Sequence, residues 1–238
     1  MLGRRGMSRI HQIIEHEETS LEHRVEQAAT LMRCFAKRTG LGGDARPQTR
    51  YLWTDALAVC NFIALAHATG ERYYGRAALR LVDDVHNTLG KHRKDVHESG
   101  WLSGLSASDG AEHPTCAGLR IGKPRAERAP GETFDEALEW ERDGQCFHYL
   151  TKWMFALTQV ARFTGEARYH RWAVELAAVQ GARDKAQCDE HREHCTFSCR
   201  ATRSLTVQLG RWAMDALSPG RLMLSCPLHA VTERKHTC

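Results

Sequence analysis

The sequence has no strong excess of charge of either sign and no long hydrophobic run. Its net charge is +4, and acidic and basic residues are interleaved through most of its 238 positions. It has no basic stripe with interleaved aromatic residues, and this argues against a nucleic-acid partner. The stretch 56–70 holds no Asp, Glu, Lys or Arg, but it is too short to span a bilayer. We therefore expect no nucleic-acid partner and no membrane association.

Targeting and cofactor-binding motifs are also missing. Residues 1–16 include three arginines but no long apolar segment and no small-residue cleavage site, so they do not resemble a secretory signal. The chain has neither a Walker-type phosphate loop nor a dinucleotide fingerprint. In Gly100–Gly104 the serine stands one position too late for a nucleophile elbow. We expect a cytoplasmic protein without a cofactor.

The nine cysteines do not predict disulfides. Cys34, Cys60 and Cys146 lie in apolar helical segments, which is typical of reduced, buried thiols, and cytosolic proteins rarely hold disulfides. A group of possible zinc ligands lies near the C-terminal end: Cys188, His191, His194, Cys195 and Cys199. The paired Cys-x2-Cys spacing of zinc knuckles is absent there, so we interpret this set as chance composition and expect no metal site.

Among the features that are present, one phrase occurs twice. Thr69-Gly70-Glu71 and Thr164-Gly165-Glu166 each follow an apolar helical run, and each precedes a tyrosine and a second helical run. This pattern predicts a helix, a tight turn and a second helix, used twice. Because one hairpin cannot bury its apolar face alone, repeats of this kind indicate stacked helical hairpins. The predicted fold class is all-α.

Helical periodicity predicts five main helices before residue 181. They span residues 17–37 (with Thr19 or Ser20 as the cap), 51–68, 71–89, 145–163 and 166–180. Helix 51–68 is apolar around nearly its whole circumference, as buried helices are, whereas helix 71–89 has a narrower apolar stripe. The hairpins are therefore expected to have an inner and an outer member, as in a toroid of hairpins.

Two segments depart from the repeat. The long segment 90–144 is rich in Gly and Pro, and its apolar residues predict a loop packed on the domain, with an extended run at Gly118–Gly122. His97, His113 and Arg120 on this loop could close over a site. Residues 181–238 contain no third Thr-Gly hairpin, so we expect a domain over 1–180 and an atypical Cys/His-containing tail with a short helix at 204–217.

The first candidate site lies at the start of the most apolar predicted helix. Asp55 is a carboxylate in the first turn of this helix, close to Trp53. One interpretation is an acid that complements the helix dipole. The other is an acid/base group or sugar ligand beside a stacking tryptophan.

The second candidate site lies at the start of helix 145–163. Asp143 and Gln145 are expected at its cap, and His148 and Lys152 lie one turn apart on a face distinct from the apolar stripe. Histidine is the usual general base near neutral pH, and paired carboxylates serve glycoside chemistry. Aromatic residues that could act as sugar-stacking platforms are Trp101, Trp140 and Trp153. The alternative is a capped, salt-bridged helix start with His148 hydrogen-bonded in the core.

The arrangement of helix, Thr-Gly-acid turn, tyrosine and helix resembles the six-hairpin (α/α)6 toroid superfamily. This group includes N-acylglucosamine 2-epimerase-like proteins and several glycosidase and unsaturated glucuronyl hydrolase families. The resemblance covers roughly residues 20–180 and rests on Tyr51–Asp55, Thr69–Tyr73, Asp143–Gln145 with His148-Tyr149, and Thr164–Glu166. It implies acid/base chemistry on a sugar, by epimerisation or hydrolysis. The candidate catalytic residues are Asp55, Asp143 and His148, and the candidate substrate-binding residues are Trp53, Trp101, Arg120, Trp140, Glu141, Gln145, Tyr149 and Lys152.

A complete toroid of this superfamily has twelve helices, more than this sequence predicts. We therefore expect a partial toroid, which is either inactive or has its open apolar face covered by a second copy of the chain. The main hypothesis is a carbohydrate-active enzyme with a small carbohydrate substrate. The alternative is a non-catalytic helical-repeat module that binds another protein.

Overall fold

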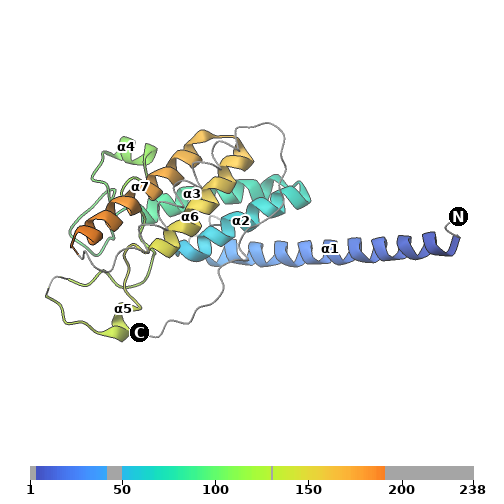
Figure 1. Ribbon diagram of the computed structural model, residues 1–238, viewed down its shortest axis with the longest axis horizontal. Helices are drawn as coiled ribbons and strands as arrows, with labels where there is room; N and C mark the ends of the chain where they lie inside the picture. Colours follow the sequence, from blue (N-terminus) through green and yellow to red (C-terminus); the bar gives the residue numbers. More distant parts are fainter. Residues whose placement is uncertain (1–3, 42–49, 130, 191–238) are drawn as a thin grey trace.

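The protein is described by a computed structural model that covers residues 4–41, 50–129 and 131–190, with side chains for 20–41, 50–129 and 131–179. This part of the chain is mostly helical and contains no β-strand. Figure 1 shows its helices, which are α1 (Arg4–Arg38), α2 (Leu52–Thr69), α3 (Arg72–Leu89), α4 (Ala107–Glu112), α5 (Glu136–Glu139), α6 (Phe147–Thr164) and α7 (Ala167–Glu190). The all-α prediction is confirmed for the described residues.

The helices of the two predicted hairpins begin close to the expected positions. Helices α2, α3 and α6 match the predictions to within two residues at each end. Helix α7 continues past residue 180 to Glu190, so regular structure crosses the boundary that we expected between domain and tail. The remaining tail, with the predicted helix 204–217 and most of the possible zinc ligands, lies outside the described residues.

Both Thr-Gly turns use the same hydrogen bonds. The Thr69 hydroxyl donates to the Leu65 carbonyl at 2.8 Å and accepts from the Glu71 N–H at 3.1 Å. The Thr164 hydroxyl makes the equivalent bonds at 2.9 and 3.1 Å. Each threonine therefore serves the end of one helix and the start of the next. Gly70 and Gly165 adopt φ of 71° and 76°, a left-handed conformation that glycine accepts without strain.

Helices α2 and α6 lie side by side and run in the same direction. Near their starts, the rings of Tyr51 and Tyr149 lie 5.6 Å apart, and near their ends the rings of His67 and Phe163 lie 5.4 Å apart. Helix α2 also packs against α1 and α3, and α6 packs against α7. The short Thr-Gly turns therefore lie at one end of the hairpins, the turn end. The connections α1–α2 and α3–α6 lie at the other, the loop end.

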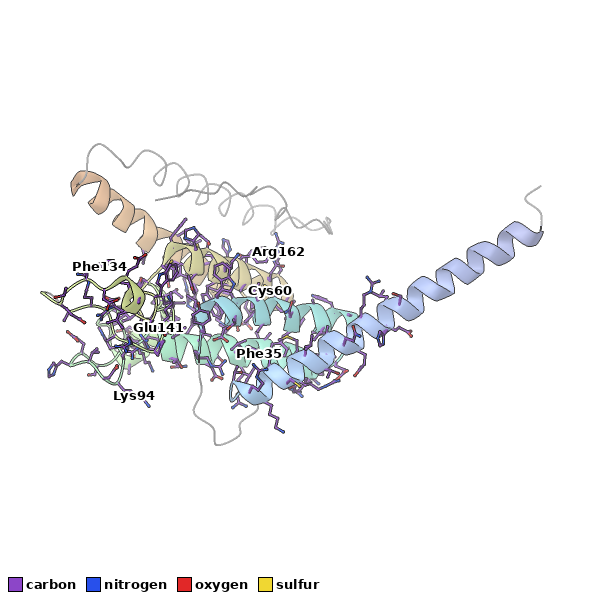
Figure 2. All side chains as sticks on the ribbon, turned by 90° about the horizontal axis from the view of Figure 1, so that it is seen from below. Phe35, Cys60, Lys94, Phe134, Glu141 and Arg162 are labelled. Atoms are coloured by element: carbon purple, nitrogen blue, oxygen red, sulfur yellow. The ribbon has the colours of Figure 1, made fainter. Side chains whose placement is uncertain are left out.

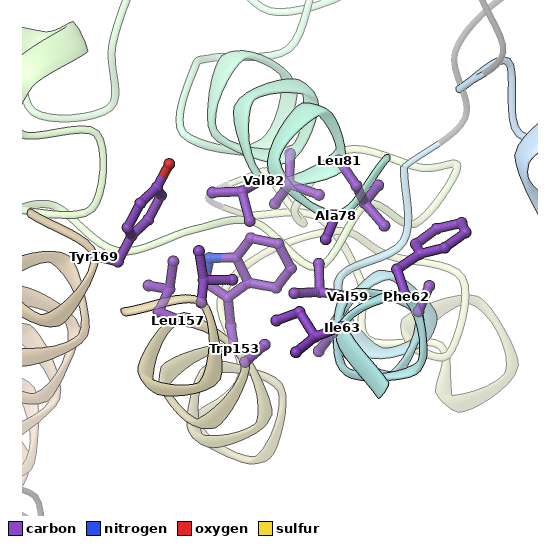
Figure 3. Packing of buried hydrophobic residues seen from close by; sticks show 14 of the residues in the cluster. Val59, Phe62, Ile63, Ala78, Leu81, Val82, Trp153, Leu157 and Tyr169 are labelled. Atoms are coloured by element: carbon purple, nitrogen blue, oxygen red, sulfur yellow. The ribbon is translucent and has the colours of Figure 1, made fainter. Parts of the chain in front are cut away.

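The core fills the space between the two hairpins. Figure 3 shows Trp153 of α6 among side chains from α2, α3 and α7. Trp153 is fully buried, and its indole N–H donates to Nε2 of the buried His86 at 3.0 Å. The sequence offered Trp153 as a sugar-stacking platform, and this interpretation is wrong, because no face of the ring is exposed.

Helix α2 satisfies the length and composition of a membrane-crossing helix over Leu52–Thr69. This range is longer than the uncharged stretch 56–70 because it includes Asp55. Core helices of soluble proteins pass the same test. In this structure Leu52, Val59 and Phe62 of α2 are fully buried against neighbouring helices.

The loop between α3 and α6 packs on the loop end, as predicted. Trp101, Leu119 and Ile121 are buried, whereas Trp140 has 72% of its surface exposed. The loop side chains Lys94, Phe134 and Glu141 gather at the end of the molecule opposite the projecting part of α1 (Figure 2). No strand forms at 118–122, but Arg120 N donates to Leu89 O and Ile121 N to Gly144 O, at 2.9 and 2.8 Å. These bonds join the loop to the end of α3 and the approach to α6.

Helix α1 differs most from its prediction. It begins at Arg4 instead of residue 17, so Thr19 and Ser20 lie inside the helix and cannot cap it. The reason is that the apolar helical spacing continues upstream through Met7, Ile10 and Ile14. Cys34 is exposed, not buried as expected, because only one side of α1 faces α2. Cys60 and Cys146 are half-buried, and no disulfide forms among the described cysteines.

Candidate functional site

Three residues that were predicted to bind substrate meet one further residue, Tyr51, at the loop end, where α2 and α6 begin. Tyr51 and Trp53 come from the start of α2, and Tyr149 and Lys152 come from the first turns of α6. The Trp53 and Tyr149 rings are in edge-to-face contact at 5.3 Å, and Lys152 Nζ lies 4.4 Å from the centre of the Trp53 ring. All four side chains are half-buried, so each keeps some surface open to solvent. We call this group the aromatic–lysine cluster.

The two tyrosine hydroxyls of the cluster are hydrogen-bonded to each other. The hydrogen bond from Tyr51, with a contribution from burial, raises the pKa of Tyr149 to about 12. Tyr149 is therefore neutral near pH 7 and can act as a hydrogen-bond donor or acceptor. Because Lys152 Nζ lies 4.4 Å from the centre of the half-buried Trp53 ring, the cluster combines an aromatic surface with a cation and hydroxyl groups.

Asp55 lies deeper in the same end of α2. Only 1% of its surface is exposed, Oδ2 accepts from the Tyr51 N–H at 3.1 Å, and Oδ1 lies 3.7 Å from Nη1 of the buried Arg50. Burial raises the pKa of Asp55 from 3.8 to about 6, against the opposing effect of Arg50. Such a pKa suits proton transfer, but the carboxylate has no accessible surface for a substrate. The observed contacts match the interpretation of Asp55 as a helix-start acid.

Arg50 joins the end of α1 to this carboxylate. Its Nη2 donates to the Thr39 carbonyl just beyond the last turn of α1, while its Nη1 faces Asp55 at the start of α2. The side chain is buried, and Nε and Nη1 make no hydrogen bond. This buried ion pair therefore connects α1 to α2 and depends on both partners being charged.

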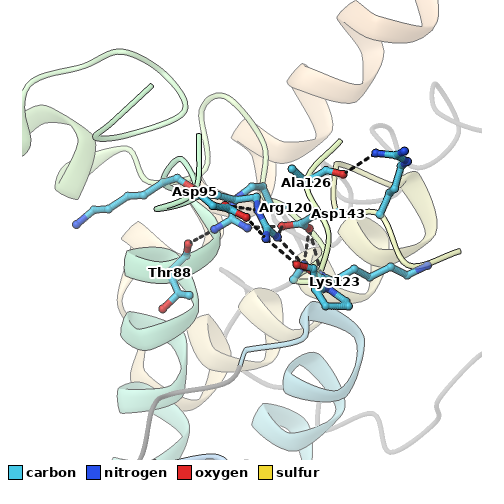
Figure 4. A network of polar contacts seen from close by, with 11 residues as sticks. Thr88, Asp95, Arg120, Lys123, Ala126 and Asp143 are labelled. Atoms are coloured by element: carbon cyan, nitrogen blue, oxygen red, sulfur yellow. Dashed lines mark hydrogen bonds and ion pairs between the residues drawn. The ribbon is translucent and has the colours of Figure 1, made fainter. Parts of the chain in front are cut away.

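Asp143 holds the loop together instead of facing a substrate. Its Oδ1 accepts from the Gly122 and Lys123 N–H groups at 2.7 and 3.3 Å, and its Oδ2 accepts from Arg93 Nη1 at 3.2 Å and from Arg120 Nη1. Figure 4 shows these bonds converging on one carboxylate. Its side chain is fully buried. The prediction that Asp143 caps α6 is wrong, because Cys146 is the N-cap and no side chain caps that helix. Both oxygens of Asp143 are engaged with the loop, so the observed contacts match a structural role.

Arg120 completes this arrangement. Its Nη2 and Nε donate to the Thr88 and Lys91 carbonyls, at 2.7 and 2.8 Å, at the end of α3. A guanidinium at the C-terminal end of a helix is favourable because the last carbonyls lack helical partners. Arg120 was predicted to bind substrate, but its donors serve the backbone and Asp143.

Gln145 also has a structural position. It was expected at the cap of α6, but Cys146 is the N-cap residue and no side chain caps that helix. Gln145 Nε2 donates to the Ala117 carbonyl at 2.9 Å, and its buried Oε1 makes no hydrogen bond. The amide lies against Gly118, where a Cβ would collide with it.

The predicted aromatic platforms do not share one surface. Trp101 is only 5% exposed; it lies under Lys91, whose Nζ is 4.4 Å from the ring centre, and against Gly110. Trp101 therefore packs inside the loop and offers no stacking face, which corrects the prediction. Trp140 is exposed and its ring neighbour is Lys123. Glu141 is exposed, and its carbonyl accepts from the Arg125 N–H at 3.0 Å.

His148 is the exposed titratable group nearest in sequence to the cluster. Its ring is in edge-to-face contact with Phe147 at 6.0 Å, so the alternative of a hydrogen-bonded core histidine is wrong. Residues four apart share one face of a helix, which places His148 on the face of Lys152. Of the three predicted catalytic residues, His148 alone has an exposed side chain.

Sequence reasoning missed one polar group that joins the loop to α7. Glu175 accepts from the Thr115 hydroxyl and pairs with His113 Nδ1, both at 2.6 Å. Trp172 of α7 donates to the Glu112 carbonyl at 2.7 Å. His113 and Glu175 are separated by 62 positions, so no local pattern could have indicated the pair.

Comparisons with family models, curated proteins and solved structures find no match to this chain. Within the described ranges, no three His, Cys, Asp or Glu residues lie close enough to hold a metal ion. The evidence for the candidate site is therefore the geometry of its residues.

Proposed function

We propose that this protein is a carbohydrate-active enzyme of the six-hairpin α/α type, a sugar epimerase or glycoside hydrolase, and that its aromatic–lysine cluster binds the sugar. The observation that carries the proposal is the meeting of Trp53, Tyr149 and Lys152 at the start of two parallel helices. Apolar sugar faces stack on aromatic rings, and sugar hydroxyls bond to hydroxyl and ammonium groups.

The arrangement of the helices supports the toroid part of the proposal. In a toroid of hairpins, the inner helices run parallel, and each hairpin has its outer helix antiparallel to the inner one. Helices α2 and α6 fill the inner role, and α1, α3 and α7 the outer role. The substrate would then bind at the loop end, where the inner helices begin.

In this proposal the proton transfer belongs to His148. Asp55 is buried in an ion pair, and Asp143 is engaged by four donors. His148 is exposed on the face of Lys152. A histidine can accept and return a proton near neutral pH, as both epimerisation and hydrolysis require.

Sugar binding can be tested with a matched pair of tryptophan variants. A panel of mono- and disaccharides is titrated while tryptophan fluorescence and heat are recorded. Trp53→Ala should weaken binding by about tenfold or more, since the loss of a stacking ring costs on the order of 1.4 kcal/mol. Trp140→Ala, which removes an exposed loop tryptophan, should leave affinity unchanged. If the folded wild-type protein binds no sugar in the panel, the proposal fails.

The chemical step is tested on any sugar that binds. Nuclear magnetic resonance separates epimerisation, which inverts one ring carbon, from hydrolysis, which releases a new reducing end. His148→Ala should lower the turnover number by about 10²–10⁴ with little change in sugar affinity. An unchanged turnover number would remove His148 from the mechanism.

A non-catalytic, protein-binding helical module is the second candidate. The observation in its favour is that α1 exposes two leucines, Leu21 and Leu31, with 56% and 70% of their surfaces open to solvent. A partner protein that covers these side chains would bury apolar surface, which favours association. Absence of sugar binding, together with association in solution, would favour this candidate.

A further inference from the structure

Lys152 is a cation of the aromatic–lysine cluster that has no acidic partner in the described part of the chain. Its side chain is half-buried, and its Nζ lies 4.4 Å from the centre of the Trp53 ring. No Asp or Glu of the described ranges lies within ion-pair distance of this ammonium. By contrast, Arg93, Arg128 and Arg142 of the loop each pair with a carboxylate. The charge of Lys152 is therefore available to a ligand.

The two candidate carboxylates of the site do not offset this charge. Asp55 is 1% exposed, and its Oδ1 lies 3.7 Å from Nη1 of the buried Arg50, so these two opposite charges balance each other. Asp143 has a fully buried side chain that pairs with Arg93 and Arg120. Neither carboxylate presents a negative charge to a molecule that binds at the surface.

The other polar groups of the cluster are also suited to an anion. Burial and the bond from Tyr51 raise the pKa of Tyr149 to about 12, so this phenol stays neutral near pH 7. Because the two hydroxyls share one hydrogen bond, the second hydroxyl proton remains available to a ligand. Helix α6 has no acidic residue in its first turn, so the positive end of its dipole adds to the charge of Lys152.

A neutral sugar would stack on Trp53 and leave the ammonium of Lys152 unpaired. A sugar with a carboxylate or phosphate would pair with it, because lysine carries a point charge on a flexible stem and binds such groups well. We propose that the site binds an anionic sugar, and that Lys152 selects its acidic group while Trp53 stacks its ring. This inference rests on the proposed sugar site and adds the charge of the substrate.

The charge preference is tested with sets of sugars that differ at one carbon. Glucose, glucuronate and glucose 6-phosphate share a ring, and the corresponding forms of galactose and mannose complete the panel. Calorimetry should show that an anionic form binds about tenfold more tightly than its neutral form, and that added salt weakens only the anionic form. Tighter binding of the uronate identifies a carboxylate ligand, and tighter binding of the sugar phosphate identifies a phosphate ligand.

The outcomes of this titration separate the inference from the proposed function. Equal affinity for the neutral and anionic forms of every set would overturn the anionic preference and leave the sugar site in place. Absence of binding by any sugar to the folded protein would overturn both.

The role of Lys152 is tested by removal of its charge. Lys152→Met keeps a long unbranched side chain and should lower the affinity for the anionic sugar about tenfold, to that of the neutral form, whereas Lys152→Arg should keep the preference. Lys91→Met is the matched control, because Lys91 Nζ also lies 4.4 Å from a ring centre, that of Trp101, which is only 5% exposed. This variant should keep the preference, and circular dichroism melting confirms that each variant is folded. A Lys152→Met protein that still prefers the anionic sugar, or that loses both forms equally, would contradict selection by this charge.

Discussion

The two ends of the hairpins are built from contacts of different range. At the turn end, the hydroxyl of Thr69 or Thr164 bonds to groups two and four residues away. At the loop end, Asp143 receives donors 20 to 50 positions distant, and Arg50 reaches back 11 positions to Thr39. The turn end therefore follows from local sequence, whereas the loop end forms only when the whole unit is assembled. This difference leads to four predictions, ordered from the largest expected effect.

Removal of the Asp143 charge should affect the loop end most. Asp143→Asn leaves Arg93 and Arg120 without their shared carboxylate, and breaking a buried ion pair costs about 3–5 kcal/mol. Chemical denaturation measures the free energy of unfolding. Asp95→Asn is the control, because Asp95 pairs with the same Arg93 but is 58% exposed, so its loss should cost less than about 1 kcal/mol. Equal effects of the two variants would contradict a buried, shared role for Asp143.

Two glycine substitutions compare the ends directly. Gly122 and Gly165 both adopt positive φ, of 87° and 76°, so alanine at either position costs about 1–2 kcal/mol of backbone strain. A Cβ at Gly122 would also lie 2.2 Å from the Arg50 carbonyl oxygen, whereas nothing lies within 4 Å at Gly165. Gly122→Ala should therefore lose a further 1–3 kcal/mol or so through overpacking. Thermal and chemical denaturation of the two variants measure this difference. Equal losses in the free energy of unfolding would mean that the loop backbone shifts at Gly122 and relieves the contact with the Arg50 carbonyl.

The pH dependence of stability tests two buried groups at the loop end. Burial lowers the pKa of His86 from 6.5 to about 3, so its contribution to stability is present above pH 6.5 and is lost as the pH falls toward 3. The raised pKa of Asp55 acts in the opposite sense: its contribution is present below pH 3.8 and is lost as the pH rises through about 6.

Between about pH 4 and 6 the contributions of these two groups should largely cancel, since each changes stability by up to roughly 1.4 kcal/mol per pH unit. The free energy of unfolding, measured by denaturation at each pH in this range, should therefore depend more steeply on pH in Asp55→Asn than in wild-type protein. Asp55→Asn should lose stability as the pH falls. His86→Gln should instead gain stability as the pH falls. Parallel pH profiles for both variants and wild-type protein would contradict the assigned pKa directions.

The smallest effect is expected at the turn end. Thr164→Val keeps the shape of the side chain but loses both hydroxyl bonds, which should cost about 1 kcal/mol, as the loss of a helix cap does. Thr39→Val at the end of α1 removes the single bond to the Phe35 carbonyl and should cost less. Differential scanning calorimetry can rank the two variants. A larger loss at Thr39 would contradict the dual role assigned to the turn threonines.

The helices of the hairpins were predicted well because, like the turn end, they depend on interactions between residues close in sequence. Helical periodicity and the Thr-Gly turns act over a few residues, so α2, α3 and α6 were found within two residues of their expected ends. The start of α1 was missed because Thr19 and Ser20 looked like caps, while the apolar stripe continued upstream. The extension of α7 was missed because the repeat pattern weakens after residue 180.

The candidate site was predicted less well because polar residues look alike in sequence whatever they contact. Trp53, Tyr149 and Lys152 were all candidates, and they do meet. Asp143 and Arg120 were candidates too, and they meet each other inside the loop. Trp101 and Trp153 lie in the interior, because aromatic rings serve cores as readily as binding surfaces.

By itself, the sequence determined the helices, their apolar faces and the tight turns, since these depend on spacing and on bonds between near neighbours. The tertiary structure decided which polar groups are buried, which carboxylate holds the loop and which aromatic rings remain accessible. The physical reason is that burial, pKa and ion pairing depend on groups far apart in the chain. Burial lowers the pKa of His86, and its ring accepts a hydrogen bond from Trp153, 67 positions away.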